Sequence, residues 1–552
     1  MWAVLAVGIV LRLSRYIRND SLWGDEAMLA LSIASRRFDQ LLAPLAYGQV
    51  APIPFLWAER FMVGLFGISE WTLRALPLLG GIALCMAILL VGRWLLRRDE
   101  LLVALVLIAF SQALVRYSAE VKPYTWDALL ALGVVGTAAK LISGTEDRAN
   151  WARLAVVGTV AVLSSLTSPF LCLGAGLALA VHALSQRRLV LLVRVGLLTL
   201  FWASLFTAVY RLVYSEAASA PYMRTFWEGS FLRPGSPDVI VRTRAALDEA
   251  SRALDAGWSA MGLSAVTLGL LLVGALTLWR RRGTPYVMLL LVPGAAPFAA
   301  SAAGSYPIAT RLILFAAPLL IMLLAAGIMR AARAAHSIIP AVPQRWMAAV
   351  LLLPTLTIGI ASTLVPRDQQ LRPLIQELKQ RWRDGEAAYV LHRVVPSWLF
   401  HSTDWAAPNI KQLAWAMRVS GPGGLGHENG PSRGARPSGE GKDLVYDLNG
   451  HPILLGTSSG IQGRPMFGHH PIRPDEGWAT NEVLRMRAAS SVVWVIIGNA
   501  APYGVDLGQI LLNTAQQVGA GITLQDSLQD GRLYRLDFHS NRHNAGESAG
   551  PS

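Results

Sequence analysis

The sequence predicts an α-helical protein that crosses a membrane many times and carries a soluble α/β domain near its C-terminal end. Hydrophobic residues make up 53% of the 552 residues and charged residues only 15%. The apolar residues come in blocks about as long as a bilayer is thick, which is typical of a polytopic membrane protein. After Pro366 the composition changes to short apolar runs between polar segments, which indicates a domain outside the bilayer.

The apolar blocks predict about eleven transmembrane helices. They lie near residues 1–17, 73–96, 101–117, 124–143, 153–166, 168–184, 189–213, 260–279, 284–303, 308–329 and 346–364. The block Ala51–Gly67 is ambiguous, because it is apolar but contains Glu59, Arg60 and two early prolines.

The arginine-rich loops decide how that block is interpreted. If it lies along the membrane interface as an amphipathic helix, the basic loops all fall on one face, which the positive-inside rule makes cytoplasmic. These loops contain Arg97, Arg98, Arg187, Arg188, Arg280, Arg281, Arg282, Arg330, Arg333 and Arg345. The N-terminus is then cytoplasmic, while an outer loop 18–72 with interfacial helices, an outer loop 214–258 and the C-terminal region are extracytoplasmic.

The net charge of +14 does not indicate a nucleic-acid partner. Much of the basic excess lies in short loops between apolar blocks, where orientation signals and anionic lipid headgroups account for it. The only cysteines, Cys85 and Cys172, lie within apolar blocks, so they imply no disulfide framework. No cleavable signal peptide is obvious, and the first apolar run is short for a span.

The chain is expected to divide into a transmembrane catalytic domain, 1–366, and an extracytoplasmic α/β domain, 367–538. In the second domain "AAYVLHRVV" and "SSVVWVIIG" predict buried strands, and "LGQILLNTAQQVG" predicts an amphipathic helix. By composition, residues 420–442 predict a disordered insertion and residues 539–552 a disordered tail.

Two adjacent carboxylates, Asp25 and Glu26, follow the first apolar block in "SLWGDEAMLA". One interpretation is structural, because acids in the first turn of a helix are favoured by the helix dipole. The other is chemical, because a carboxylate at membrane depth is tolerated only where it faces a cavity or a partner.

A second charged segment, "VRYSAEVKPYTWD", ends the third predicted span. Pro123 forces Lys122 out of helical geometry, which leaves Glu120, Lys122 and Tyr124 in a tight outer turn on the same side as Asp25. The structural alternative is a helical Arg116–Glu120 pair with an aromatic anchor at the interface.

A third charged position is Arg311 in "GSYPIATRLILFAAP", just inside the outer end of a span. An outer arginine without a nearby acid in the sequence suggests an anionic ligand, although it also suits an arginine that reaches a lipid headgroup.

The aromatic and cationic loop 214–258 either covers a sugar site or rests on headgroups. "FGHHPIRPDEG", at 467–477, lacks the spacing of a metal site and is expected to be a solvated loop.

One carboxylate together with outer cations fits a defined reaction. Transfer of a sugar from a polyprenyl phosphate needs a base for the acceptor hydroxyl and cations for the departing phosphate. The lipid tail would lie between helices, with the phosphate at the interface.

The ordered segments "LWGDEA", "YGQVAPIPF", "GISEWTLRALP", "SAEVKPY" and "YPIATRLILFAAP" resemble those of the bacterial protein O-mannosyltransferase-like glycosyltransferases of the GT-C superfamily, which also contains the lipid A aminoarabinose transferase. The resemblance covers roughly residues 1–370. It implies an inverting transfer that needs no metal or other cofactor, with Asp25 as the catalytic base. It places Lys122 and Arg311 near the donor phosphate. The other implied substrate-binding residues are Glu26, Gln49, Glu120, Tyr124 and Tyr306.

The expected protein is therefore a glycosyltransferase of the bacterial cytoplasmic membrane that uses a polyprenyl-phosphate-linked sugar and an acceptor hydroxyl on a lipid, glycan or protein. Two alternatives remain open. A non-enzymatic flippase or carrier for the same lipid would show discontinuous helices or paired half-repeats. A polysaccharide polymerase or ligase would carry a large outer loop rich in arginine and histidine.

Overall fold

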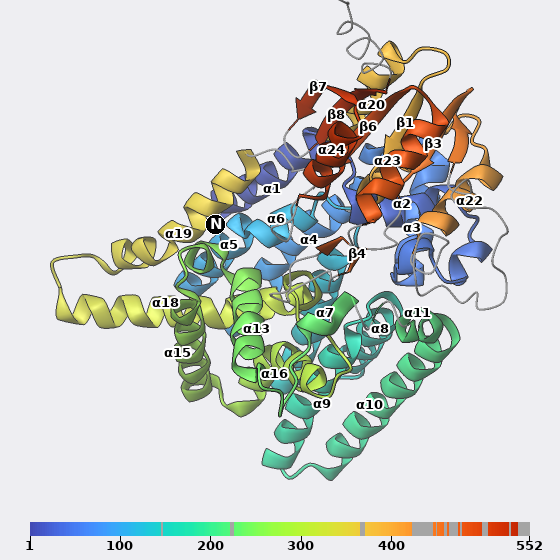
Figure 1. The fold of residues 1–552 in the computed structure, drawn as a ribbon. Coiled ribbons are helices and arrows are strands. Elements are labelled where there is room, and N and C mark those ends of the chain that lie inside the picture. Colours follow the sequence, from blue (N-terminus) through green and yellow to red (C-terminus); the bar gives the residue numbers. More distant parts are fainter. Residues whose placement is uncertain are drawn as a thin grey trace, which may run out of the picture. The chain divides into compact units, whose positions relative to one another are not determined.

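The computed structural model describes residues 1–144, 147–220, 223, 226–364, 370–421, 445–448, 450–456, 461–462, 473–474, 477–498, 506–528 and 531–538. It is mostly helical, with a sheet in the C-terminal region (Figure 1). The chain forms two compact units, which are described separately. Unit 1 contains Met1–Asn19, Ala51–Ser215 and Trp227–Val365, and unit 2 contains Asp20–Val50, Glu216–Phe226 and Pro366–Ser552.

Unit 1 is a bundle of apolar helices. Its elements are α1 (Trp2–Ile17), α3 (Ile53–Phe66), α4 (Glu70–Leu95), α5 (Arg98–Phe110), α6 (Gln112–Tyr117), α7 (Tyr124–Ile142), α8 (Arg148–Ser164), α9 (Ser168–Ser185), α10 (Leu189–Val209), η3 (Tyr210–Tyr214), η4 (Glu228–Ser230), α13 (Val239–Leu254), α14 (Ala256–Ala260), α15 (Ser264–Arg282), α16 (Thr284–Ala302), α17 (Thr310–Ile313), η5 (Leu314–Ala316), α18 (Ala317–Ile338) and α19 (Gln344–Leu364). The short helix α11 (Ser215–Ser219) follows η3 at the unit boundary.

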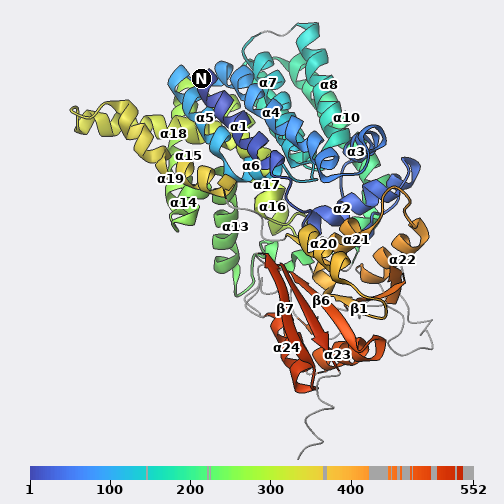
Figure 2. The ribbon, with the colours of Figure 1, turned by 90° about the horizontal axis from the view of Figure 1, so that it is seen from above.

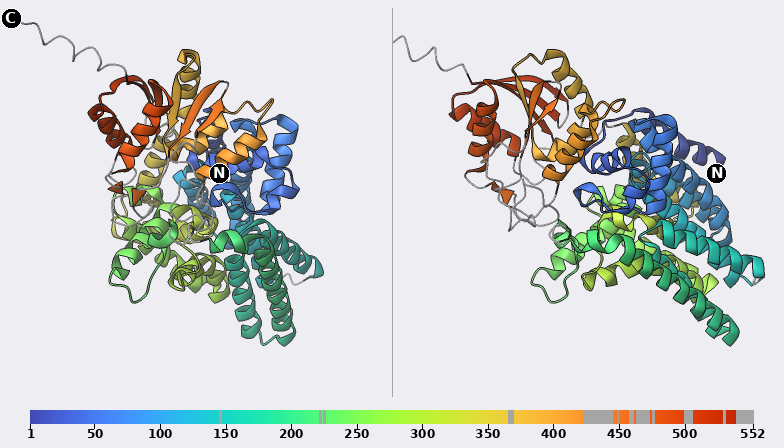
Figure 3. Two further views of the ribbon diagram at one scale, coloured as in Figure 1. Left: turned by 45° about the vertical axis from the view of Figure 1, so that its right-hand side comes forward. Right: turned by 90° about the vertical axis from the view of Figure 1, so that its right-hand side faces the viewer.

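Local sequence explains where these helices begin. Ser69 accepts a hydrogen bond from the backbone N–H of Thr72 at the start of α4, and Asp147 accepts one from Asn150 at the start of α8. Pro123 precedes the first residue of α7. Figure 3 shows α8, α9 and α10 side by side, and these helices pack against one another through small and apolar residues.

Eight helices among the described residues are long and apolar enough to cross a membrane. They are Glu70–Leu95, Tyr124–Ile142, Ser168–Ser185, Leu189–Ser219, Ser264–Arg282, Thr284–Ala302, Thr310–Ile338 and Gln344–Leu364. The sequence predicted about eleven spans, so the prediction of a polytopic membrane protein is confirmed while the number differs.

The three remaining predicted spans are helical but short. The block 1–17 is α1 with 16 residues, and all but the last two residues of the block 153–166 lie within α8, which has 17 residues. The block 101–117 is broken at Ser111, whose backbone ψ of 113° ends α5 after 13 residues and begins α6. All three are shorter than the roughly 20 residues that a span typically needs. The ambiguous block Ala51–Gly67 forms α3, which has only 14 residues.

Unit 2 contains a six-stranded sheet in the order β2-β3-β1-β6-β8-β7. Its elements are α2 (Gly24–Ser35), η1 (Asp39–Leu42), η2 (Ala46–Gly48), α20 (Leu371–Arg381), β1 (Ala387–Val390), η6 (His392–Val394), α21 (Val395–Ser402), α22 (Ile410–Ser420), β2 (Val445–Leu448), β3 (His451–Leu455), β4 (Ile461–Gln462), β5 (Arg473–Pro474), α23 (Trp478–Ala489), β6 (Val492–Gly498), α24 (Leu507–Gln517), β7 (Gly521–Leu528) and β8 (Gly531–Asp537).

The central strands of this sheet are those that the sequence predicted. β1 pairs in parallel with β3 and β6, and all four of its residues are buried. This accounts for its unbroken apolar run, because parallel strands are covered on both faces. Figure 2 shows α23 and α24 against one side of the sheet, and α20 covers the other. The predicted insertion 420–442, beyond its first two residues, and the tail 539–552 lie outside the described residues.

Candidate functional site

The turn between α6 and α7 gathers the charges that the sequence singled out. Glu120 is fully buried and Lys122 is only 5% exposed. The backbone N–H of Lys122 donates to the Glu120 carbonyl over 2.7 Å, which makes the turn tight. The Arg116 side chain donates to Glu120 Oε1, also over 2.7 Å, so the helical pair predicted as the structural alternative is present. Tyr124 packs edge-on against Tyr117 at 5.0 Å.

Arg311 lies in the first turn of α17, half-buried against an aromatic ring. Its guanidinium carbon is 5.1 Å from the centre of the Trp227 ring, within the range of a cation–π contact. Trp227 is buried and comes from the loop 214–258. This part of the loop packs onto the turn before α17, because Ile308 N–H donates to the Ser230 carbonyl over 2.8 Å.

A buried acid from the same loop fixes the start of α17. Glu249 on α13 accepts the backbone N–H of Thr310 over 2.7 Å and also the Thr310 hydroxyl. Its other carboxylate oxygen pairs with Arg252. The first four backbone N–H groups of a helix lack acceptors within the helix. Glu249 supplies an acceptor for one of them and thereby holds Thr310, the residue next to Arg311. Nothing in the sequence indicated this contact, which joins positions 61 residues apart.

Tyr306 lies in the turn between α16 and α17. Its hydroxyl donates to the Leu312 carbonyl over 2.8 Å, and its ring packs edge-on against Phe170 at 5.0 Å. Burial, together with the nearby Asp127 carboxylate, raises the pKa of the Tyr306 hydroxyl. Tyr306 is therefore a neutral hydrogen-bonding group.

Asp127 is a site candidate that the sequence interpretation missed. It lies on α7 one turn after Tyr124, is 6% exposed and interacts with the Ser165 hydroxyl. Its Oδ1 accepts no hydrogen bond from the part of the chain that the structure describes. A carboxylate buried in a membrane-spanning helix is costly and usually functional. The sequence signal that could have identified it is an acid four residues beyond Pro123, within an apolar block.

Unit 2 contains the other expected site residues. Asp25 lies in the first turn of α2 and is partly exposed, and the Gln49 amide donates to its Oδ1 over 3.3 Å. The same amide nitrogen is 3.5 Å from the sulfur of Met28. Glu26 is fully buried. The adjacent acids therefore have different surroundings, and Asp25 is the one that water reaches.

The expected site residues thus form two groups. In unit 1, Glu120, Lys122 and Tyr124 share one turn, and Tyr306 is tied to the α17 segment that carries Arg311. In unit 2, Asp25 and Gln49 are in contact and Glu26 lies beside them in the sequence. Among the described residues, no three histidine, cysteine, aspartate or glutamate side chains group as metal ligands would. The histidines of 467–477 lie outside the described residues.

Comparison with solved structures identifies the fold. The chain superimposes on ArnT from Cupriavidus metallidurans bound to undecaprenyl phosphate with a TM-score of 0.50 and 12% identity, covering 100% of this chain and 99% of that one. The apo state of the same protein gives 0.50 at 14% identity, with 97% of each chain covered. The chain has the ArnT-like GT-C fold. An Archaeoglobus fulgidus oligosaccharyltransferase, in complex with Zn and sulfate, matches with a TM-score of 0.45 at 16% identity over 71% of this chain and 60% of that one.

The likeness to ArnT is structural, because the identities are low. No protein-family model and no curated protein sequence matches the chain. The ArnT-like fold agrees with the GT-C resemblance of the ordered segments. It extends over the whole chain, whereas that resemblance covers roughly residues 1–370.

Proposed function

We propose that the protein is a membrane glycosyltransferase that moves a sugar from a polyprenyl-phosphate-linked donor to an acceptor hydroxyl on the extracytoplasmic face, with inversion. The observation that carries the proposal is the nearly buried Lys122, held in a tight turn at the end of a candidate span. A cation held in place where little water reaches it is effective at stabilising negative charge on a phosphate. ArnT has the same fold and was solved with undecaprenyl phosphate, which supports a polyprenyl phosphate as the donor carrier.

The surroundings of each side chain support the following proposed roles. Asp25 is partly exposed and acts as the general base on the acceptor hydroxyl. Lys122 and Arg311 stabilise the phosphate as its bond to the sugar breaks. Tyr306, Glu120 and Tyr124 line the donor side of the reaction, and Gln49 orients the base. Breakage of the sugar–phosphate bond and capture of the acceptor proton leave a glycoside and a free polyprenyl phosphate.

A deletion strain tests the proposal. Its lipid extract should accumulate one polyprenyl-phosphate sugar, and one envelope glycan, lipid or protein should lack a sugar residue. The purified protein, reconstituted with that lipid and an envelope extract from the deletion strain, should then release free polyprenyl phosphate. A carrier or flippase would move the lipid without releasing the phosphate, so absence of release would favour that alternative.

The orientation has its own test. A cysteine at Ser69 should react with an impermeant thiol reagent added from outside, whereas one at Arg98 should not. Cys85 and Cys172 are buried, so they contribute little background. The reverse pattern would place the predicted catalytic residues on the cytoplasmic face.

A further inference from the structure

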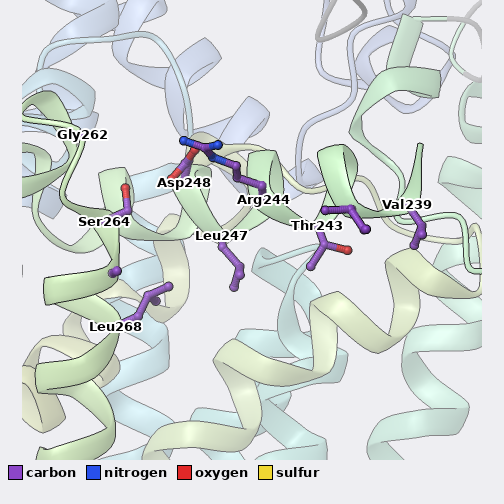
Figure 4. Close-up of a pocket in the computed structure, with 10 residues that line it drawn as sticks. Val239, Thr243, Arg244, Leu247, Asp248, Gly262, Ser264 and Leu268 are labelled. Atoms are coloured by element: carbon purple, nitrogen blue, oxygen red, sulfur yellow. The ribbon is translucent and has the colours of Figure 1, made fainter. Parts of the chain in front are cut away.

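A groove between α13 and the start of α15 is separate from every residue given a role above. It has a volume of about 480 Å³. Apolar side chains form most of its wall, and Arg244 and Asp248 stand one helical turn apart on α13 (Figure 4). The lining residues used below are Ile240, Arg244, Leu247, Asp248 and Leu268.

The charges of this groove are not used within the protein. Neither Arg244 nor Asp248 forms an ion pair in the described part of the chain, although both line the same cavity. Figure 4 shows their charged ends on one side of the groove, and Leu247 and Leu268 on the other. A ligand that complements this arrangement carries an anion and a cation close together, attached to an apolar chain.

The apolar side continues along a membrane span. Leu268, Leu272 and Leu276 are spaced four residues apart on α15, so they lie on one face of the helix. Leu272 is 64% exposed and Leu276 is 45% exposed. At the groove itself Ile240 is 81% exposed. An apolar stripe thus leads from the groove along a helix that is long and apolar enough to cross the bilayer.

We propose that this groove binds a bilayer phospholipid with a primary-amine headgroup, the phosphatidylethanolamine class. Arg244 contacts the phosphate, Asp248 accepts hydrogen bonds from the ammonium, and an acyl chain follows Leu268 onto the α15 stripe. The site goes beyond the proposed function and does not depend on it. The opposite face of α13 carries Glu249, so the bound lipid packs against the helix that holds Thr310.

Native mass spectrometry of the full chain tests this assignment. The protein is purified in mild detergent and equilibrated with equal amounts of phosphatidylethanolamine, phosphatidylglycerol and phosphatidylcholine. Wild type should retain phosphatidylethanolamine about threefold to fivefold over each of the others, the scale of a partly exposed charge pair. D248N should abolish that preference, whereas R244Q should reduce retention of all three lipids.

A charge swap and a matched control complete the experiment. The double variant with Arg244→Asp and Asp248→Arg should keep the preference for phosphatidylethanolamine, because phosphate and ammonium exchange places. R211Q, at an exposed arginine outside the groove, should behave as wild type. A preference for phosphatidylglycerol, equal retention of the three lipids, or retention of none would overturn the proposal.

Discussion

Two charged segments of the chain differ in how far water reaches them. In the segment from Glu120 to Asp127 of unit 1, both acids are buried and Lys122 is nearly so. In the first turn of α2 in unit 2, Asp25 is partly exposed and accepts a hydrogen bond from the Gln49 amide over 3.3 Å.

This difference suits two different tasks. A charge that holds an anion works best when neighbouring groups fix it and water is excluded, since electrostatic attraction is stronger in a medium of low dielectric constant. A base that takes a proton from an incoming hydroxyl has to be reachable. The buried segment is thus suited to the donor phosphate and the open turn to the acceptor.

The largest effect is expected when the proton acceptor is removed from the first turn of α2. Asp25→Asn keeps the shape of the side chain but loses the base, so turnover should fall roughly 10² to 10⁴-fold while donor binding survives. Glu26→Gln is the matched control. Because Glu26 is fully buried, its loss should lower stability by about 1–3 kcal/mol, with turnover per folded molecule near wild type.

Turnover per folded molecule, measured on material that elutes as a single species, separates these outcomes. If Asp25→Asn transfers sugar at the wild-type rate, the acid serves only the first turn of α2. In that case the variant should cost about 1 kcal/mol of stability instead.

Lys122 and Arg311 should affect binding of the donor rather than the proton transfer. Arg311→Ala removes the charge-assisted contact that we propose with the phosphate. Such a contact is worth about 1.5–3 kcal/mol, or roughly a 10- to 150-fold increase in the KM for the donor. Lys122→Met keeps the length of the side chain and should act in the same direction. An Arg311→Ala protein with normal transfer would mean that the arginine only reaches a lipid headgroup.

Sequence patterns predicted the local features of both regions. The apolar runs gave β1 and β6, because buried parallel strands have few polar residues. Pro123 located the turn that presents Lys122. Composition, however, did not reveal the break at Ser111, which is a backbone feature inside an apolar block. The predicted span 101–117 was therefore two helices.

Long-range pairing accounts for what the sequence did not reveal. Glu249 looked like an ordinary helix acid, and only the packing of α13 against α17 brings it to Thr310. Trp227 beneath Arg311 is a contact of the same kind. Asp127 was visible as an acid in an apolar block. Its hydrogen bond with Ser165, 38 residues later in the chain, could not be read from the sequence.

A smaller effect is expected when Arg311 is misplaced rather than removed. Thr310→Val deletes the hydroxyl that donates a hydrogen bond to Glu249, whereas Thr310→Ser retains it. Thr310→Val loses one hydrogen bond between a neutral hydroxyl and a charged carboxylate, while the backbone contact with Glu249 remains. The donor KM should therefore rise about threefold to tenfold. The kcat should be unchanged, and Thr310→Ser should match wild type. A lower kcat with an unchanged KM would mean that this contact does not act through Arg311.

The smallest effect concerns the amide beside Asp25. The Gln49–Asp25 contact is 3.3 Å long, near the upper limit for a hydrogen bond, so Gln49→Ala should lower kcat only about twofold to threefold. Gln49→Glu is more informative, because a second carboxylate makes Asp25 harder to ionise. In a plot of transfer rate against pH, the acidic limb should then move about one pH unit higher. At pH values well above that limb, the rate should stay near that of Gln49→Ala. An unshifted profile would show that the titrating base is not the carboxylate next to residue 49.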